Sequence, residues 1–192
     1  MPDNIYLKGN FLSIKYYAPV YDRLQKEFQL ALPLSEQSNR WLERISKTNS
    51  VSLHVRRTDY VNNPKTSKFH SVLGLEYYAR AVAWMQDKLE QPEFYVFSDD
   101  QEWARAHIKT PGSSTYYVDC NNADNGYQDF HLMRNCRSHI IANSGFSRWA
   151  AYLNSNPNKQ VCMPSRWFSE ERIGDSDVAP ESWVRIDNQT HG

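Results

Sequence analysis

Short apolar runs alternate along the chain with longer stretches in which apolar residues recur every three or four positions. The runs are typical of buried strands and predict strands at 50–55, 93–98, 115–118, 138–142 and 159–163. The recurring pattern is clearest at 75–89, where five apolar residues share one helical face: Leu75, Tyr78, Val82, Met85 and Leu89. Further helices are expected at 17–30, 36–47, 100–107, 126–137 and 146–153. The alternation predicts an α/β fold with a three-layer, Rossmann-like parallel sheet.

The same pattern divides the chain into three parts. Residues 1–48 are expected to form a helical N-terminal extension, 49–168 the Rossmann-like domain, and 169–192 a C-terminal loop or tail. From residue 164 onward the sequence is loop-like, with Trp167, Phe168 and Trp183 as its expected packing anchors. A long loop is expected at 59–74, which contains Asn62-Asn63-Pro64.

Charge and composition narrow the classes of partner. The 192 residues include 22 basic and 22 acidic side chains, so no overall field attracts nucleic acid, and any anion site must be local. No stretch approaches ~20 apolar residues, and the first residues lack signal-peptide features, so we expect neither a membrane span nor a leader. Cys120, Cys136 and Cys162 show no disulfide or zinc-ligand spacing and suit a reducing cytosol.

Polar residues cluster where four of the predicted strands end. These clusters are 54–60, 98–100, 143–147 and 164–167. In an open α/β sheet, ligands bind outside the carboxyl ends of the strands. Because all four clusters meet at that edge, the sequence predicts a binding site there.

The first cluster contains two consecutive arginines. Strand alternation sends His54 and Arg56 to one side and Arg57 to the other. An arginine fork suits a pyrophosphate, so one arginine is expected to face a ligand and the other to pair with Asp59 or Asp99. A solvated surface pair is the alternative.

The other clusters each allow two interpretations. Residues 143–147 lead into a helix whose N-terminus favours phosphate, with Ser144 and Ser147 as extra donors, or they form a plain cap. The carboxylates of Asp99 and Asp100 could bind a divalent metal, but we favour a helix cap. Asp129 lies in a predicted helix and could accept hydrogen bonds from a guanine edge, or it is an exposed acid.

Several segments resemble one family in order and spacing. His54-Val55-Arg56-Arg57-Thr58-Asp59-Tyr60 resembles the HxRRxD motif of α-1,2- and α-1,6-fucosyltransferases. Residues 97–103, 129–144 and 146–154 resemble three further family segments, and the likeness covers roughly residues 5–168. The closer likeness is to the bacterial-type α-1,2 branch, glycosyltransferase family 11.

The resemblance implies the donor-binding half of a GT-B enzyme that transfers fucose from GDP-fucose, with inversion and without a required metal or other cofactor. Arg56 would hold the β-phosphate and stabilise departing GDP, and His54 and Asp129 would contact the nucleoside. Residues 143–147 (Asn143, Ser144, Gly145, Phe146 and Ser147) would cradle the pyrophosphate, and Asp99 or Asp100 would line the pocket. The acceptor would be a galactose-type hydroxyl of a glycan, and Asp59 and His70 are candidate bases.

The sequence also departs from the family pattern. Thr58 stands where this branch has Gly, whereas α-1,6 enzymes also carry Thr at this position. Gly145 replaces a Thr of the family pattern. Arg148 replaces a Trp and is expected to add charge near the pyrophosphate or to face solvent.

The family's N-terminal domain has no counterpart here, so we expect that half, or a partner chain, to complete the acceptor site. The alternatives are α-1,6 specificity and GDP-sugar binding without turnover. The family branch points to a cytoplasmic protein, with peripheral contact to the inner membrane left open.

Overall fold

A computed structural model describes residues 6, 8–9, 11–58, 72–169 and 174–189, and its centre is a six-stranded sheet. The strands are β1 (Ser50–Val55), β2 (Glu93–Ser98), β3 (Thr115–Tyr117), β4 (Ser138–Ile140), β5 (Val161–Pro164) and β6 (Val184–Ile186). Their order is β3-β2-β1-β4-β5-β6, and every pair is parallel. The predicted α/β fold with a parallel sheet is confirmed.

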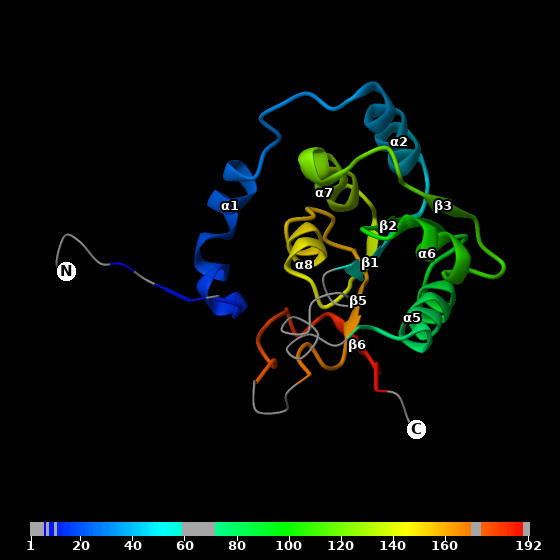
Figure 1. The fold of residues 1–192 in the computed structure, drawn as a ribbon. Helices are drawn as coiled ribbons and strands as arrows, with labels where there is room; N and C mark the ends of the chain where they lie inside the picture. Colours follow the sequence, from blue (N-terminus) through cyan, green and yellow to red (C-terminus); the bar gives the residue numbers. More distant parts are fainter. Residues whose placement is uncertain (1–5, 7, 10, 59–71, 170–173, 190–192) are drawn as a thin grey trace.

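Helices cover both faces of the sheet (Figure 1). One face carries α5 (Leu75–Lys88) and α6 (Gln101–His107), and the other carries α2 (Glu36–Lys47), α7 (Gly126–Arg134) and α8 (Gly145–Tyr152). Alternate residues of β2 separate the two layers, because Phe94 and Val96 pack with α5 whereas Tyr95 and Phe97 pack with α7. All six residues of β1 are buried, as expected for a strand covered on both faces.

The N-terminal part is helical but more broken than the pattern predicts. The single helix expected at 17–30 is replaced by a 3-10 turn, η2 (Ala18–Val20), and a short helix, α1 (Tyr21–Glu27), and a further 3-10 turn, η1 (Ile14–Tyr16), precedes them. Pro19 lies in the first turn of η2, and none of the three has a fully buried residue. These three elements therefore lack the buried stripe that stabilises a longer helix. The remaining predicted helices and strands differ from the observed ones by up to three residues at their ends, and η3 (Ala123–Asn125) precedes α7.

The C-terminal segment contains a strand where the sequence predicts only loop. Strand β6 pairs with β5 through Cys162–Val184, Met163–Arg185 and Pro164–Ile186. Three residues are too few to display an alternating pattern, which explains why it was missed. Trp167, Phe168 and Trp183 are at most 7% exposed and share one cluster, so their predicted role as packing anchors is confirmed.

Arg148 joins the two ends of the described chain instead of facing phosphate or solvent. Its side chain is buried, and Nη1 donates to the carbonyl oxygens of Leu12 (2.5 Å) and Val178 (3.0 Å). Ser13 Oγ also donates to Asp177 Oδ2 (2.7 Å), and Ile14 N donates to Asp177 O (2.8 Å). We call residues 12–15 and 177–178, with Arg148 between them, the terminal clasp. Both expectations for Arg148 were wrong because they placed it from its neighbours in sequence alone.

Within the described ranges, no helix is both long and apolar enough to cross a bilayer.

Candidate functional site

A cavity of about 930 Å³ opens at the carboxyl ends of β1 and β2, beside α7 and the N-terminus of α8. The chain runs outward from β1 to β3 and then returns to β4 on the other side of β1, so the sheet changes direction at this point. Ligands of open α/β sheets bind at such switch points. The lining residues are His54, Arg56, Thr58, Phe97, Ser98, Asp99, Gln101, Asn121, Asn122, Ala123, Gly126, Asp129, Ser144 and Phe146.

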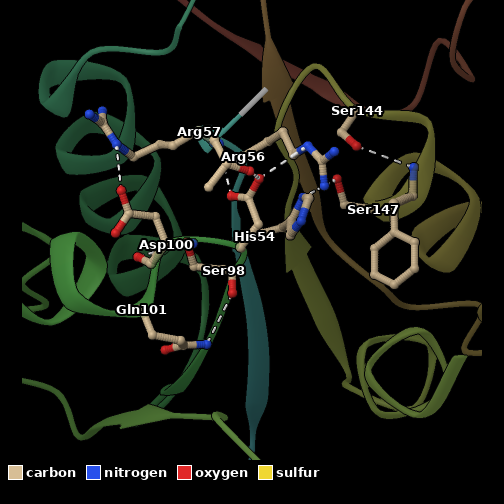
Figure 2. Close-up of polar contacts among 11 residues, drawn as sticks. His54, Arg56, Arg57, Ser98, Asp100, Gln101, Ser144 and Ser147 are labelled. Atoms are coloured by element: carbon tan, nitrogen blue, oxygen red, sulfur yellow. Dashed lines mark hydrogen bonds and ion pairs between the residues drawn. The ribbon is translucent and has the colours of Figure 1, made fainter. Parts of the chain in front are cut away.

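The two arginines that follow β1 point to different surroundings, as strand alternation predicts. Arg56 lines the cavity together with His54, whereas Arg57 does not. Figure 2 shows Arg57 extended toward Asp100 while His54 and Arg56 lie on the side of Ser144 and Ser147. The Arg57 guanidinium lies 3.8 Å from the centre of the Trp103 ring, and its Nε is 3.6 Å from Asp100 Oδ2. Arg56 is therefore the arginine that lines the cavity.

Asp99 holds the turn after β1 in place. Its carboxylate accepts hydrogen bonds from the backbone N of Arg57 (2.9 Å), the backbone N of Thr58 (3.1 Å) and Thr58 Oγ1 (2.5 Å). Its Oδ2 is also 3.3 Å from Arg56 Nε. Asp99 thus fixes both the backbone beyond Arg56 and the direction of the Arg56 side chain. The Thr58 hydroxyl is part of this network, which gives the departure from Gly a structural role.

Asp100 is the N-cap of α6, which confirms the cap interpretation of residues 98–100. Its Oδ1 accepts a hydrogen bond from the backbone N of Trp103 (3.1 Å), and its other oxygen faces Arg57. Asp100 is absent from the cavity lining. Its carboxylate therefore serves the local fold, and Asp99 is the member of the pair that borders the cavity.

Replacing Asp100 with alanine should destabilise the protein by about 1–2 kcal/mol, because the N-cap bond and the contact to Arg57 are both lost. Urea denaturation would show this as a lower midpoint with an unchanged slope. Glu102→Gln, in the first turn of the same helix, is the matched control and should stay within about 0.5 kcal/mol. A loss of GDP affinity without a loss of stability would contradict the assignment of Asp100 to the helix cap.

His54 is buried at the head of the cavity and is neutral near pH 7. Burial lowers its pKa to about 4, and the charge of Arg56 acts in the same direction against the opposing effect of Asp99. Its Nδ1 lies 2.9 Å from Ser147 Oγ in α8. A neutral imidazole at this position can donate or accept one hydrogen bond toward the cavity.

The N-terminus of α8 closes one end of the cavity. Ser144 is its N-cap, with Oγ accepting from the backbone N of Phe146 (3.3 Å), and Ser144 and Phe146 both line the cavity. The first turn contains no acidic residue. Its free N–H groups and the helix dipole leave this end of the cavity electropositive, next to Arg56.

Asp129 borders the cavity from α7 in a water-poor setting. Burial raises the pKa of its carboxyl to about 6, although a hydrogen bond from Asn121 Nδ2 (2.6 Å to Oδ1) works in the opposite direction. That bond occupies one carboxylate oxygen. The other can accept hydrogen bonds from a ligand that carries N–H groups.

The structure brings six predicted site residues to the cavity: His54, Arg56, Asp99, Asp129, Ser144 and Phe146. Four others are not among the lining residues: Asp100 caps α6, Asn143 is buried with Nδ2 3.4 Å from Trp167 O, Gly145 begins α8 and Ser147 contacts His54. The two candidate bases, Asp59 and His70, lie outside the described residues. Sequence reasoning missed Asn121 and Asn122, although two consecutive asparagines just after a strand were a usable signal.

Comparison with known proteins places the chain in a family. The family model described as "Glycosyl transferase family 11" matches residues 1–187. The O-antigen biosynthesis glycosyltransferase WbnK of Escherichia coli is 39% identical over 140 residues, covering 72% of this chain and 45% of that protein. An alpha-1,2-colitosyltransferase of Escherichia coli is 31% identical over 190 residues, covering 97% of this chain and 64% of that protein.

A more distant relative is the galactoside alpha-(1,2)-fucosyltransferase 1 of Ateles belzebuth, 29% identical over 191 residues, covering 94% of this chain and 52% of that protein. The chain thus spans between 45% and 64% of the length of these three relatives. The family model matches nearly the whole chain and agrees with the motifs that line the cavity, so the chain belongs to glycosyl transferase family 11.

Proposed function

We propose that the cavity binds the GDP part of GDP-fucose and that the protein takes part in inverting transfer of fucose to a galactose-type hydroxyl of a glycan. The observation that carries the proposal is the polarity of the cavity. Arg56 and the N-terminus of α8 form a cationic end suited to a diphosphate, and Asp129 provides an acceptor for a base with N–H donors. The sheet would be the donor-binding half of a GT-B enzyme.

The arrangement supports departure of a diphosphate leaving group. As the acceptor hydroxyl attacks C1 of fucose, negative charge builds up on the departing phosphate. Arg56 is already oriented by Asp99, so its charge would stabilise that state without reorganisation. The His54 ring and the first N–H groups of α8 would add hydrogen-bond donors. Asp59 and His70 remain the candidate bases, and metal independence remains part of the proposal.

An α-1,2 linkage is favoured over α-1,6. The names of two relatives specify 1,2 transfer, one of colitose and one of fucose to a galactoside. Thr58, the residue that suggested α-1,6 specificity, hydrogen-bonds Asp99, so it has a local role apart from linkage. A transfer assay with galactose-terminated acceptors, fucosyl and colitosyl donors, and EDTA tests the linkage, the sugar and the metal independence. Binding without transfer would support the alternative of a chain that binds GDP-sugar without turnover.

Guanine recognition by Asp129 is testable through ligand chemistry. Wild-type protein should bind GDP about 10- to 100-fold more tightly than inosine diphosphate, which lacks the exocyclic amine, because a hydrogen bond to a charged group contributes about 1.5–3 kcal/mol. Asp129→Asn should remove most of that preference, as measured by calorimetry. Equal affinities of the wild type for the two nucleotides would argue against Asp129 as the base-reading group.

The same contact should depend on pH. A ligand N–H binds the ionised carboxylate, and the pKa of free Asp129 is about 6, so GDP affinity should fall by about tenfold between pH 7 and pH 5. The phosphates of GDP also titrate in this range. The decisive quantity is therefore the difference between wild type and Asp129→Asn, in which the part due to Asp129 should vanish. Parallel pH profiles for the two proteins would contradict the assignment.

A further inference from the structure

His54 in β1 lines the cavity and forms a buried pair with Ser147, which comes from a distant segment, α8. Their side chains are separated by 2.9 Å between His54 Nδ1 and Ser147 Oγ, and the residues are 4% and 2% exposed. Figure 2 shows the imidazole and the hydroxyl facing each other beside Arg56. Ser147 was expected to contact pyrophosphate, but it does not line the cavity. Ser147 is therefore linked to the cavity through its contact with His54.

The direction of this hydrogen bond follows from the donors and acceptors present. His54 is neutral near pH 7, so only one ring nitrogen carries hydrogen. Among the described residues, the sole partner of the Ser147 hydroxyl is His54 Nδ1. If Nδ1 carried the hydrogen, the hydroxyl hydrogen would be buried without an acceptor, which is an unfavourable arrangement. The hydroxyl therefore donates to Nδ1, and the ring hydrogen resides on Nε2.

The second ring nitrogen is open to the cavity. His54 Nε2 makes no hydrogen bond with any described residue. In the described chain, the fully buried side-chain atoms without a hydrogen-bond partner are Arg57 Nε, Gln101 Oε1 and His139 Nε2. His54 Nε2 is not among them, so this atom is accessible. Since His54 lines the cavity, Nε2 is reached from that side.

We propose that Ser147 is a positioning residue that fixes His54 as the Nε2–H tautomer, so that His54 presents a neutral hydrogen-bond donor to the nucleotide in the cavity. The choice of nucleotide as recipient rests on the proposed function, whereas the tautomer follows from the Ser147 contact of a neutral imidazole and does not depend on that function. The Nε2–H donor complements Arg56, because it directs a hydrogen bond to the nucleotide without adding positive charge. It also gives a role to a hydroxyl that lies in the first turn of α8 but outside the cavity lining.

The tautomer can be read directly by long-range ¹H–¹⁵N NMR of the nucleotide-free protein at pH 7. In the wild type, the Nδ1 shift of His54 should be that of an unprotonated nitrogen and the Nε2 shift that of a protonated one. Ser147→Ala should move both shifts toward a mixture of tautomers, and Ser147→Thr should restore them. Ser144→Ala, which removes the cap hydroxyl of the same helix, is the matched control and should leave the His54 shifts unchanged. A protonated Nδ1 in the wild type would overturn the proposal even if no variant folds.

Calorimetric titration with GDP then tests the consequence. Ser147→Ala should weaken binding about three- to tenfold, the effect of one neutral hydrogen bond, and Ser147→Thr should recover most of it. Unchanged GDP affinity in Ser147→Ala, despite mixed tautomers, would overturn the positioning role. If the folded wild type binds no GDP at all, the proposed function fails, while the NMR result still decides the tautomer.

Discussion

Replacing Arg56 with alanine is expected to slow fucosyl transfer by about 10²–10³-fold, the effect of removing one preorganised charge stabiliser. The residue lines the cavity at its cationic end, and its direction is set by Asp99 at 3.3 Å. Single-turnover transfer from GDP-fucose measures the loss, and calorimetry with GDP measures the share that comes from binding. Arg56→Lys should recover only part of the activity, because it keeps the charge but loses the planar fork of donors.

The neighbouring arginine supplies the matched control. Arg57 has the same side chain one position later, but it stacks on Trp103 and pairs with Asp100 outside the cavity. Arg57→Ala should therefore lower stability more than it lowers GDP affinity. Equal losses of GDP affinity in the two variants, or an Arg56→Ala enzyme within threefold of wild type, would contradict the roles assigned to the pair.

Trp167→Ala should destabilise the protein by about 3–5 kcal/mol, the usual cost of truncating a buried aromatic side chain. The side chain is 1% exposed and packs with Met163, Val178 and Trp183 in the cluster under β5. Its carbonyl oxygen also accepts a hydrogen bond from the side-chain amide of Asn143, just before α8. The free energy of unfolding in urea measures the effect. Trp167→Phe should lose less stability, because its ring still fills part of the space that alanine would leave empty in the core.

An exposed aromatic residue provides the comparison for this prediction. Tyr16 is 62% exposed, so Tyr16→Ala should change stability by no more than about 0.5 kcal/mol. A Trp167→Ala protein as stable as Tyr16→Ala would show that the packing around β5 and β6 contributes little to folding.

The parts of the site that depend on local pattern could be predicted from the sequence. Strand alternation placed His54 and Arg56 together and Arg57 apart, and small polar residues before an apolar stretch marked the start of α8. Asp100 was identified as a cap because acids are favoured in that position. These features need only a few consecutive residues and a known strand or helix.

Pairings between distant segments could not be predicted in this way. His54 and Ser147 are 93 positions apart, and alternation indicates the side on which a residue lies but not the residue that it meets there. Asn121 and Asp129 come together only because a short 3-10 turn folds the chain between them. Strand β6 is stabilised by its pairing with β5 and has too few residues to carry a signal of its own.

The terminal clasp sets limits on how the protein can be engineered. Arg148 is a buried cation whose two carbonyl partners come from Leu12 and Val178, outside the predicted 49–168 unit on either side. A protein trimmed to residues 49–168 would keep the cation in α8, the helix that closes the cavity, and lose both of its acceptors. A minimal version for crystallisation or display should therefore retain residues 12–189, which include the clasp, Trp183 and strand β6, with any affinity tag added beyond those bounds.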